Sequence, residues 1–358
     1  MSNATRRWQR QSVDECVQTA GVSRAAAELF LASDVVDLHV DSYIWVRVFG
    51  YRLDREHGPG LFAGRYYSQV DLPRLCRTGI TGATWVITTN PLRGSRARSR
   101  ALARNLAALG GLLGSAASDV ALAASASDYR RIVDSGKHAA FIGLQGGNAF
   151  GSEMQLLDAP PKELIRVTLL HLNSSPLGRT SAPLANLQRD PLTPFGCSVV
   201  ERLNQARIFV DLAHIDRRAF QRALDVHDPK LPPIVTHTGV DGCYPHWRNL
   251  NDAQIRAIAQ RGGVVGIMYH TPFLGPGFER GSLRLVIDHL EHVIRVGGEH
   301  CAALGSDWDG AIVTPSDMPT CRELPRLVDE MLRRGWAHER IQNVLGSNFL
   351  RSLRDLRG

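Results

Sequence analysis

The sequence predicts an α/β fold of the (β/α)8 barrel (TIM-type) class. Eight short runs of apolar and β-branched residues recur along its 358 residues, and each is separated from the next by a stretch long enough for a helix. The runs are nearly continuous rather than alternating, which is typical of parallel strands buried on both faces. An open doubly wound sheet is the alternative, but no glycine-rich phosphate-binding turn follows the first run. The pattern therefore favours a closed barrel.

The eight runs give the expected strands in chain order. They are VVDLHVD (35–41), GATWVITT (82–89), HAAFIGLQGG (138–147), RVTLLHLN (166–173), IFVDLAH (208–214), PPIVTHTG (232–239), GGVVGIMYH (262–270) and CAALGSDWDG (301–310). Residues 35–358 are predicted to form the barrel. Residues 1–34 form an N-terminal extension whose amphipathic helix, over 13–31, is expected to pack on the outside of the barrel.

Helix signals fill the stretches between these runs. Residues 97–116 carry a clear apolar stripe. Ser198 and Asn251 each stand immediately before a helical pattern and are predicted to be N-caps. These helices would form the outer layer of the barrel.

The composition narrows the range of functions. The chain is 44% hydrophobic and 22% charged with a net charge of +7, and its one basic cluster, 93–100, has no interleaved aromatic residues. This disfavours a nucleic-acid partner. No run approaches the ~18 apolar residues of a membrane span, so no membrane association is expected. Six scattered cysteines without a paired motif indicate reduced thiols and a cytoplasmic location.

Polar residues stand at the ends of the predicted strands, where the active site of such a barrel forms. His39 and Asp41 are two residues apart on one strand, so their side chains share a face. His214 and His237 end two later strands. A single histidine there is more often a hydrogen-bonded core residue, but four such groups at strand ends favour a site for a zinc-like ion.

Three further residues have the chemistry of a hydrolytic site. Asp307 follows a strand and could move a proton to a leaving amine, whereas Asp309, before Gly310, better fits a turn. His171 could donate a hydrogen bond to a developing oxyanion. Arg248 precedes a capped helix and suits a substrate carboxylate, although a salt bridge at the helix entry is equally common.

With these residues in place, the sequence resembles the membrane (renal) dipeptidase family of the amidohydrolase superfamily. The resemblance runs from about residue 35 to 351 and is carried by VVDLHVD, QVDLPRLCRTGITGATW, GLQGGNAF, LLHLNSS, PLTPFGCSVVERLNQARIFVDLAH, PIVTHTG, RNLNDAQIRAIAQRGGVVGI, LGSDWDG and VLGSNFLRSL, in the family's order. It implies a barrel that hydrolyses a dipeptide or dipeptide-like amide with metal-activated water. It also implies a possible homodimer.

The resemblance assigns metal ligands. His39 and Asp41 would hold one zinc ion, and His214 and His237 a second. The family usually has a glutamate that bridges the two ions, and this chain has Gln145 at that position. A neutral amide is a poor bridge between two cations. One zinc ion is therefore favoured over two, with Gln145 a doubtful ligand.

The resemblance also assigns catalytic and substrate-binding residues. His171 would polarise the scissile carbonyl, and Asn173 would contribute to substrate binding beside it. Arg248 would bind the C-terminal carboxylate of the dipeptide, and Asp307 would transfer the proton.

Two alternatives remain because of Gln145. The chain could be a catalytically silent member that binds a small ligand, or it could act on another amide such as a lactam or cyclic imide. Glu153, beyond the third strand, is a possible replacement carboxylate.

Overall fold

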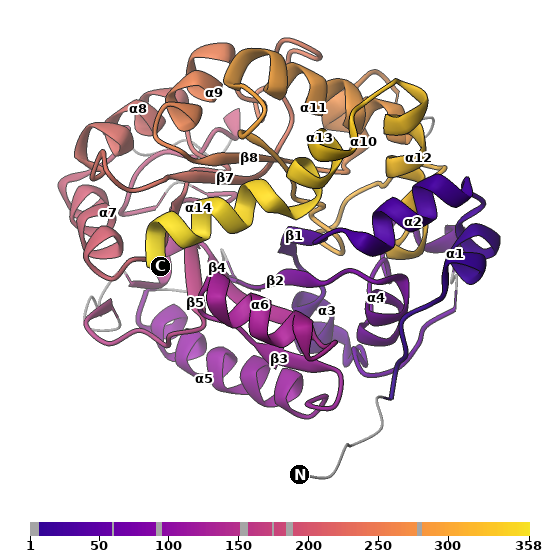
Figure 1. The fold of residues 1–358 in the computed structure, drawn as a ribbon. Coiled ribbons are helices and arrows are strands. Elements are labelled where there is room, and N and C mark those ends of the chain that lie inside the picture. Colours follow the sequence, from indigo (N-terminus) through magenta and orange to yellow (C-terminus); the bar gives the residue numbers. More distant parts are fainter. Residues whose placement is uncertain are drawn as a thin grey trace.

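Eight parallel strands form a ring with helices around it (Figure 1). The structure is a computed structural model that describes residues 7–58, 61–90, 95–150, 157–173, 175–183, 189–277 and 281–358. Glu153 and part of the basic cluster 93–100 lie outside these residues. The ring strands are β1 (Val36–Val40), β2 (Gly82–Thr88), β4 (His138–Gln145), β5 (Leu164–Thr168), β6 (Phe209–Asp211), β7 (Ile234–Thr238), β8 (Val264–Ile267) and β9 (Ala302–Leu304).

Each ring strand pairs in parallel with the next in that order. The ring closes between its first and last strands through a parallel bridge from Val40 to Trp308, where the amide of Asp41 donates to the carbonyl of Trp308 at 2.8 Å. All the residues of these eight strands are buried, as expected when helices cover a parallel sheet. The predicted barrel is therefore confirmed.

One strand was not predicted from the sequence. β3 (Val120–Leu122) pairs in parallel with β4 but lies outside the ring. A three-residue strand with two half-buried positions has too little apolar character to stand out from its surroundings.

The helices alternate with the strands and cover the outside of the ring. Within the described residues they are α1 (Val13–Ala20), α2 (Arg24–Ala32), α3 (Tyr43–Phe49), α4 (Leu72–Thr78), α5 (Ser95–Gly114), α6 (Ala126–Asp134), α7 (Pro194–Gln205), α8 (Arg217–Val226), α9 (Asp252–Ala259), α10 (Thr271–Leu274), α11 (Leu283–Gly297), α12 (Pro325–Arg333), α13 (His338–Gln342) and α14 (Asn348–Arg357). Short 3-10 helices span Leu61–Gly64, Gly147–Phe150 and Cys321–Glu323, and a π-helix spans Asn343–Ser347.

The helix caps test two sequence predictions. Asn251 caps α9 and forms a reciprocal capping box with Gln254, as predicted. The prediction for Ser198 was wrong, because α7 begins four residues earlier. Thr193 is its N-cap and accepts from the amide of Gly196 at 3.1 Å. Pro194 fits the first helical position, which needs no backbone N–H donor.

The N-terminal extension contains two helices where one was predicted. Gly21 adopts a left-handed conformation (φ 66°) that ends α1, and Ser23 then caps α2. α2 packs on α1 and on α12, on the outside of the ring (Figure 1). The division between an extension at 1–34 and a barrel at 35–358 stays a prediction.

The C-terminal helix α14 lies across the end of the barrel where the strands begin (Figure 1). Its Phe349 contacts Phe141 of β4 and Phe209 of β6, with ring centroids 5.9 and 6.0 Å apart. At its other end, Arg357 donates to the carbonyls of Ala124, Lys162, Leu164 and Arg207. α14 therefore closes this end of the ring, which leaves the opposite end for a site.

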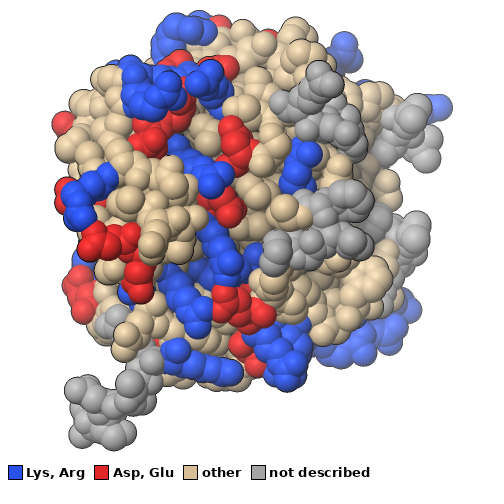
Figure 2. Space-filling model, turned by 90° about the vertical axis from the view of Figure 1, so that its right-hand side faces the viewer, with Lys and Arg blue, Asp and Glu red and all other residues tan. Residues whose placement is uncertain are grey.

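Charged side chains are mixed on the face shown in Figure 2, where basic groups lie among acidic ones. This distribution fits the view that the net charge of +7 is spread over solvated helix faces. Among the described helices, none has both the length and the apolar character needed to cross a membrane.

A buried histidine makes the fold sensitive to acid. His138 is 3% exposed, and burial lowers its pKa to about 4, while its Nδ1 lies 2.9 Å from the carbonyl of Ile80. The unfolded chain binds a proton near pH 6.5 and the folded chain does not, so stability falls as pH drops from about 6.5 toward 4. We expect His138 to contribute a loss of about 2 kcal/mol between pH 7 and 5.

Urea unfolding of the wild type and of His138→Gln at both pH values measures this contribution. The glutamine can still donate to Ile80 but does not titrate. The variant should therefore lose about 2 kcal/mol less than the wild type over this range. Equal losses in the two proteins would show that His138 is not the group responsible.

Candidate metal centre

The polar residues expected at the strand ends come together at the end of the barrel opposite α14. His39, His237 and Asp307 form its centre, with one possible ligand atom of each lying within 4.8 Å of the others. The two imidazoles are fully buried and Asp307 is 8% exposed. His39 Nε2 lies 3.5 Å from a carboxylate oxygen of Asp41 and 3.6 Å from one of Asp307. Two imidazoles and two carboxylates in this arrangement form a donor set typical of zinc.

The other two histidines reach the centre from loops. β5 ends at Thr168 and β6 at Asp211, so His171 and His214 each lie three residues beyond a strand. The sequence had instead placed them within the predicted strand runs 166–173 and 208–214. His214 has φ 63°, a left-handed conformation that is uncommon outside glycine. The rings of His171 and His214 pack edge to face at 4.8 Å.

Asp307 is held by a tight turn. It also has φ 63°, and its carbonyl accepts from the amide of Gly310 at 2.9 Å. A Cβ at position 310 would lie 2.3 Å from a carboxylate oxygen of Asp307. Glycine at 310 is therefore required for the carboxylate to occupy this place.

Asp309 has a different role from Asp307. Its carboxylate accepts from the amides of Gln69 and Val70 and from the hydroxyl of Ser42. It therefore ties together loops that surround the site, and it is a structural residue. The sequence suggested that the Asp309 side chain stabilises a local turn, but its carboxylate instead accepts hydrogen bonds from residues distant in the sequence.

Hydrogen bonds around His237 fix the position of its proton. Thr236 Oγ1 donates its single proton to Asp211 at 2.8 Å, so it can only accept from His237 Nδ1 at 2.9 Å. The neutral imidazole of His237 then presents a lone pair at Nε2, which lies 2.8 Å from His214 Nε2.

His214 Nε2 also lies 3.2 Å from the side-chain amide nitrogen of Gln145. Neutral imidazoles bind metal ions through their ring nitrogens, and those of His214 and His237 lie side by side here. The arrangement therefore fits a metal ion at this end of the barrel.

Gln145 lies in the wall of the site, where its side-chain amide contacts Thr88 and His214. Its amide oxygen lies 3.2 Å from Thr88 Oγ1, and that hydroxyl also donates to Asp41 at 2.5 Å. The buried Gln145 is thus placed between Asp41 and His214, where the resemblance puts the bridging residue.

Burial sets the charge of the imidazoles. It lowers the pKa of His214 and of His237 well below the usual value and lowers that of His171 to about 4. Uncharged imidazoles are the form that binds metal. Burial, and then the charge of Asp41, raise the pKa of Asp307 well above its usual value, whereas the nearby Arg248 lowers it.

Arg248 is 3% exposed, and burial lowers its pKa to about 10. Its Nη2 donates to the carbonyl of His237 at 2.8 Å, and its Nε has no hydrogen-bond partner among the described residues. No helix-entry salt bridge to Arg248 is found in the described part of the chain.

Asn173 is exposed, two residues after the partly exposed His171, on the loop that follows β5. No contact places it in the centre among the described residues. Its role in substrate binding stays a prediction.

Sequence reasoning missed two buried charges beneath the centre. Arg166 of β5 and Asp211 of β6 are 1% and 0% exposed and form an ion pair at 3.1 Å. Arg166 also reaches His39 Nδ1 at 2.8 Å. The signal was present, because each charge interrupts an apolar strand run, where a charged residue is rarely buried without a partner.

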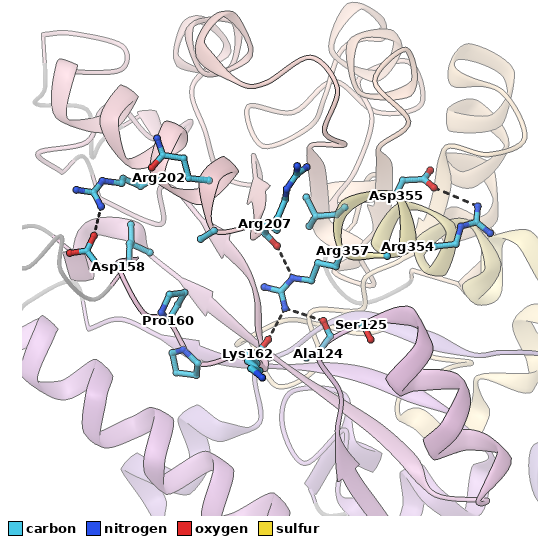
Figure 3. A pocket seen from close by; sticks show the side chains of 16 residues that line it. Ala124, Ser125, Asp158, Pro160, Lys162, Arg202, Arg207, Arg354, Asp355 and Arg357 are labelled. Atoms are coloured by element: carbon cyan, nitrogen blue, oxygen red, sulfur yellow. Dashed lines mark hydrogen bonds and ion pairs between the residues drawn. The ribbon is translucent and has the colours of Figure 1, made fainter.

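A large cavity at the other end of the barrel is a different feature. Its volume is about 960 Å³, and it lies beside the end of α14 (Figure 3). Arg202 pairs there with Asp158, Arg354 with Asp355, and Arg357 with backbone carbonyls. In Figure 3 these arginines point in different directions, so they do not form a common binding point.

Barrel and centre together define the chain as a (β/α)8 barrel with a buried histidine–carboxylate cluster where the strands end. Comparison with known proteins identifies the family. The sequence model of the membrane dipeptidases (Peptidase family M19) matches residues 23–357. The chain therefore belongs to the membrane dipeptidase family, and the resemblance noted in its sequence is confirmed.

Individual relatives agree with this assignment. The dipeptidase tcpJ of Claviceps purpurea (strain 20.1) is 30% identical over 237 residues, 66% of this chain and 55% of that protein. An uncharacterized Klebsiella pneumoniae protein encoded in the pqqA 5' region is 32% identical over 168 residues, 46% of this chain and 61% of its own length. The matches thus span only 55% and 61% of these two relatives.

Solved structures share the fold. The probable dipeptidase PvdM of Pseudomonas aeruginosa has a TM-score of 0.81 at 17% identity, covering 96% of this chain and 99% of PvdM. A Rhodobacter sphaeroides metallo peptidase, liganded with a phosphinate mimic of the dipeptide L-Ala-D-Ala, has a TM-score of 0.77 at 22% identity. That match covers 90% of this chain and 98% of the other.

Proposed function

We propose that this protein is a metal-dependent dipeptidase that hydrolyses the amide bond of a dipeptide or dipeptide-like substrate. The observation that carries the proposal is the buried cluster of His39, His237 and Asp307, with the lone pair of His237 Nε2 turned toward His214. Membership of the membrane dipeptidase family supports it. So does the dipeptide mimic bound by the Rhodobacter sphaeroides relative.

The candidate metal ligands form two halves of the centre, with His39 and Asp41 on one side and His214 and His237 on the other. We infer zinc because nitrogen and carboxylate donors suit it. We infer one ion rather than two because Gln145 has no charge with which to bridge a pair. When bound, the ion would activate water and polarise the scissile carbonyl.

The chain's own groups then supply binding and proton transfer. The guanidinium of Arg248 would bind the C-terminal carboxylate of the dipeptide, and His171 would donate to the carbonyl oxygen as negative charge develops on it. Asp307, whose pKa is raised by burial, would take up a proton and deliver it to the leaving amine.

Location and assembly complete the proposal. We infer a cytoplasmic enzyme because all six cysteines are free thiols, three of them buried. We infer a homodimer from the resemblance to the family. The proposed substrate is a small molecule, and we propose no nucleic-acid or membrane partner.

A substrate panel tests the function. Zinc-loaded protein is expected to hydrolyse one or more members of a set of L,L and L,D dipeptides, with a slower rate on N-acyl amino acids and on a lactam. Hydrolysis of the lactam alone would replace the proposed substrate class with a cyclic amide. The absence of turnover on the whole panel would favour a silent, ligand-binding member.

Substitution of Arg248 tests the carboxylate contact. We expect Arg248→Met to raise KM for dipeptides about 10- to 100-fold with a smaller change in kcat, because a charge-assisted hydrogen bond to a buried partner contributes about 1.5–3 kcal/mol. The matched control is a dipeptide amide, which lacks the carboxylate. Wild type and variant should have similar KM values for it, and an equal rise in KM with both substrates would contradict the assignment.

A further inference from the structure

Arg166 is a buried cation directly beneath the centre. It occupies the third position of β5, with its side chain inside the ring, and it lies opposite Gly143 of β4 in the strand register. A Cβ on Gly143 would lie 2.7 Å from Arg166 Nε, so only glycine at 143 leaves room for the guanidinium. The neighbouring strand is thus shaped around this side chain.

The guanidinium is held in one orientation. Its Nη1 donates to Thr168 Oγ1 at 2.6 Å and to Asp211 at 3.1 Å, and its Nη2 lies 2.8 Å from His39 Nδ1. Asp211 is fixed in turn by the amides of Ala213 and Thr236 and by the hydroxyl of Thr236. The contact with His39 is therefore part of a rigid network.

An arginine side chain has donors and no acceptor. His39 Nδ1 must accept from Arg166, so the single proton of the neutral His39 imidazole lies on Nε2. That nitrogen has no hydrogen-bond partner among the described residues and faces the carboxylates of Asp41 and Asp307. A protonated nitrogen has no lone pair to offer a metal ion.

His237 has the opposite arrangement. Its Nδ1 donates to Thr236, and its Nε2 carries the lone pair. Metal-binding histidines almost always donate their second N–H to a neighbour in this way, which fixes the ligand nitrogen and raises its basicity. The two histidines at the core of the centre are therefore not equivalent.

We propose that Arg166 is a positioning residue that holds His39 in the Nε2–H form, so that the His237 side of the centre binds the first cation and the His39 side binds a second only weakly. The positive charge of the guanidinium also weakens binding of a second cation on the His39 side, because it lies beneath His39 and repels that cation. This inference rests on the proposed metal centre and explains which half of it would bind the first metal ion.

Nitrogen NMR of the full-length protein, labelled with ¹⁵N-histidine and freed of metal with a chelator, tests the proposal without any substitution. The two-bond ¹H–¹⁵N correlations of His39, assigned by their loss in His39→Gln, should show a proton on Nε2 and none on Nδ1. His237 should show the reverse. A proton on Nδ1 of His39 in the wild type would overturn the proposal.

Metal binding by two variants gives the second measurement. Arg166→Gln places an amide oxygen, which can accept from Nδ1, beneath His39, whereas the matched control Arg166→Lys keeps a donor-only cation. Calorimetric titration with Zn²⁺ should show at least about tenfold tighter binding of the second ion to the glutamine variant than to the wild type or the lysine variant. The same comparison on a Gln145→Glu background adds a bridging carboxylate and makes the second site easier to measure.

Equal second-ion affinity in all three proteins would contradict the proposal. If the glutamine variant does not fold, the NMR measurement on the wild type still decides. The outcomes also separate this inference from the proposed function. If the protein hydrolyses dipeptides but carries a proton on Nδ1 of His39, only the role of Arg166 is wrong. If the protons lie where we predict but no dipeptide is hydrolysed, only the proposed function is wrong.

Discussion

Replacing His237 by alanine is expected to lower kcat/KM for dipeptides by about 10³-fold or more. His237 is the central imidazole of the cluster, its Nε2 presents a fixed lone pair, and it contacts both His39 and His214. Loss of a metal ligand at this point removes several kcal/mol of transition-state stabilisation, and each 1.36 kcal/mol is a factor of ten in rate. Steady-state kinetics, together with the zinc content of the purified variant, measures the effect.

His227→Gln is the matched control for this substitution. His227 is also a buried histidine, but it lies at the end of α8 with its Nδ1 2.9 Å from the carbonyl of Asp228. It should keep wild-type zinc content and kcat/KM within about threefold, because it has no contact with the centre. Zinc-dependent turnover at the wild-type rate in His237→Ala would remove His237 from the proposed ligand set.

Asparagine at position 307 is expected to lower kcat by about 10²- to 10⁴-fold while KM changes little. The amide keeps an oxygen toward the cluster but can neither take up nor deliver the proton. Zinc content should stay near that of the wild type, which separates proton transfer from metal binding. A variant that loses both its zinc and its activity would identify Asp307 as a ligand rather than a proton donor.

Asp309→Asn is the matched control, since it changes a second buried carboxylate two residues away. Asp309 accepts from the amides of Gln69 and Val70 and does not belong to the cluster. We expect a loss of stability with less than about a tenfold change in kcat. A fall in kcat as large as that of Asp307→Asn would show that the two carboxylates cannot be told apart by this test.

The barrel was predictable from the sequence for a simple physical reason. Strands covered on both faces must be apolar along their whole length, so eight apolar runs between helical segments were visible without any tertiary information. His39 and His237 were also predictable, because they interrupt such runs and lie within β1 and β7. β3 was not, because its pairing with β4 outside the ring depends on tertiary contacts.

The details of the site depended on geometry that periodicity does not encode. His171 and His214 lie beyond the ends of β5 and β6, and the left-handed conformation of His214 directs it toward His237. The contact between Arg166 and His39 joins residues 127 positions apart. The sequence contained the buried arginine, but only the closed ring shows that it meets a histidine of the centre.

Zinc titration of chelator-treated protein, with dipeptide hydrolysis measured at each step, tests the claim that hydrolysis depends on the metal centre. We expect no turnover in the metal-free protein and a rate that rises with added zinc until about one ion is bound per chain. Full turnover of the metal-free protein in the presence of chelator would contradict the claim. So would saturation with zinc that yields no hydrolysis of any dipeptide.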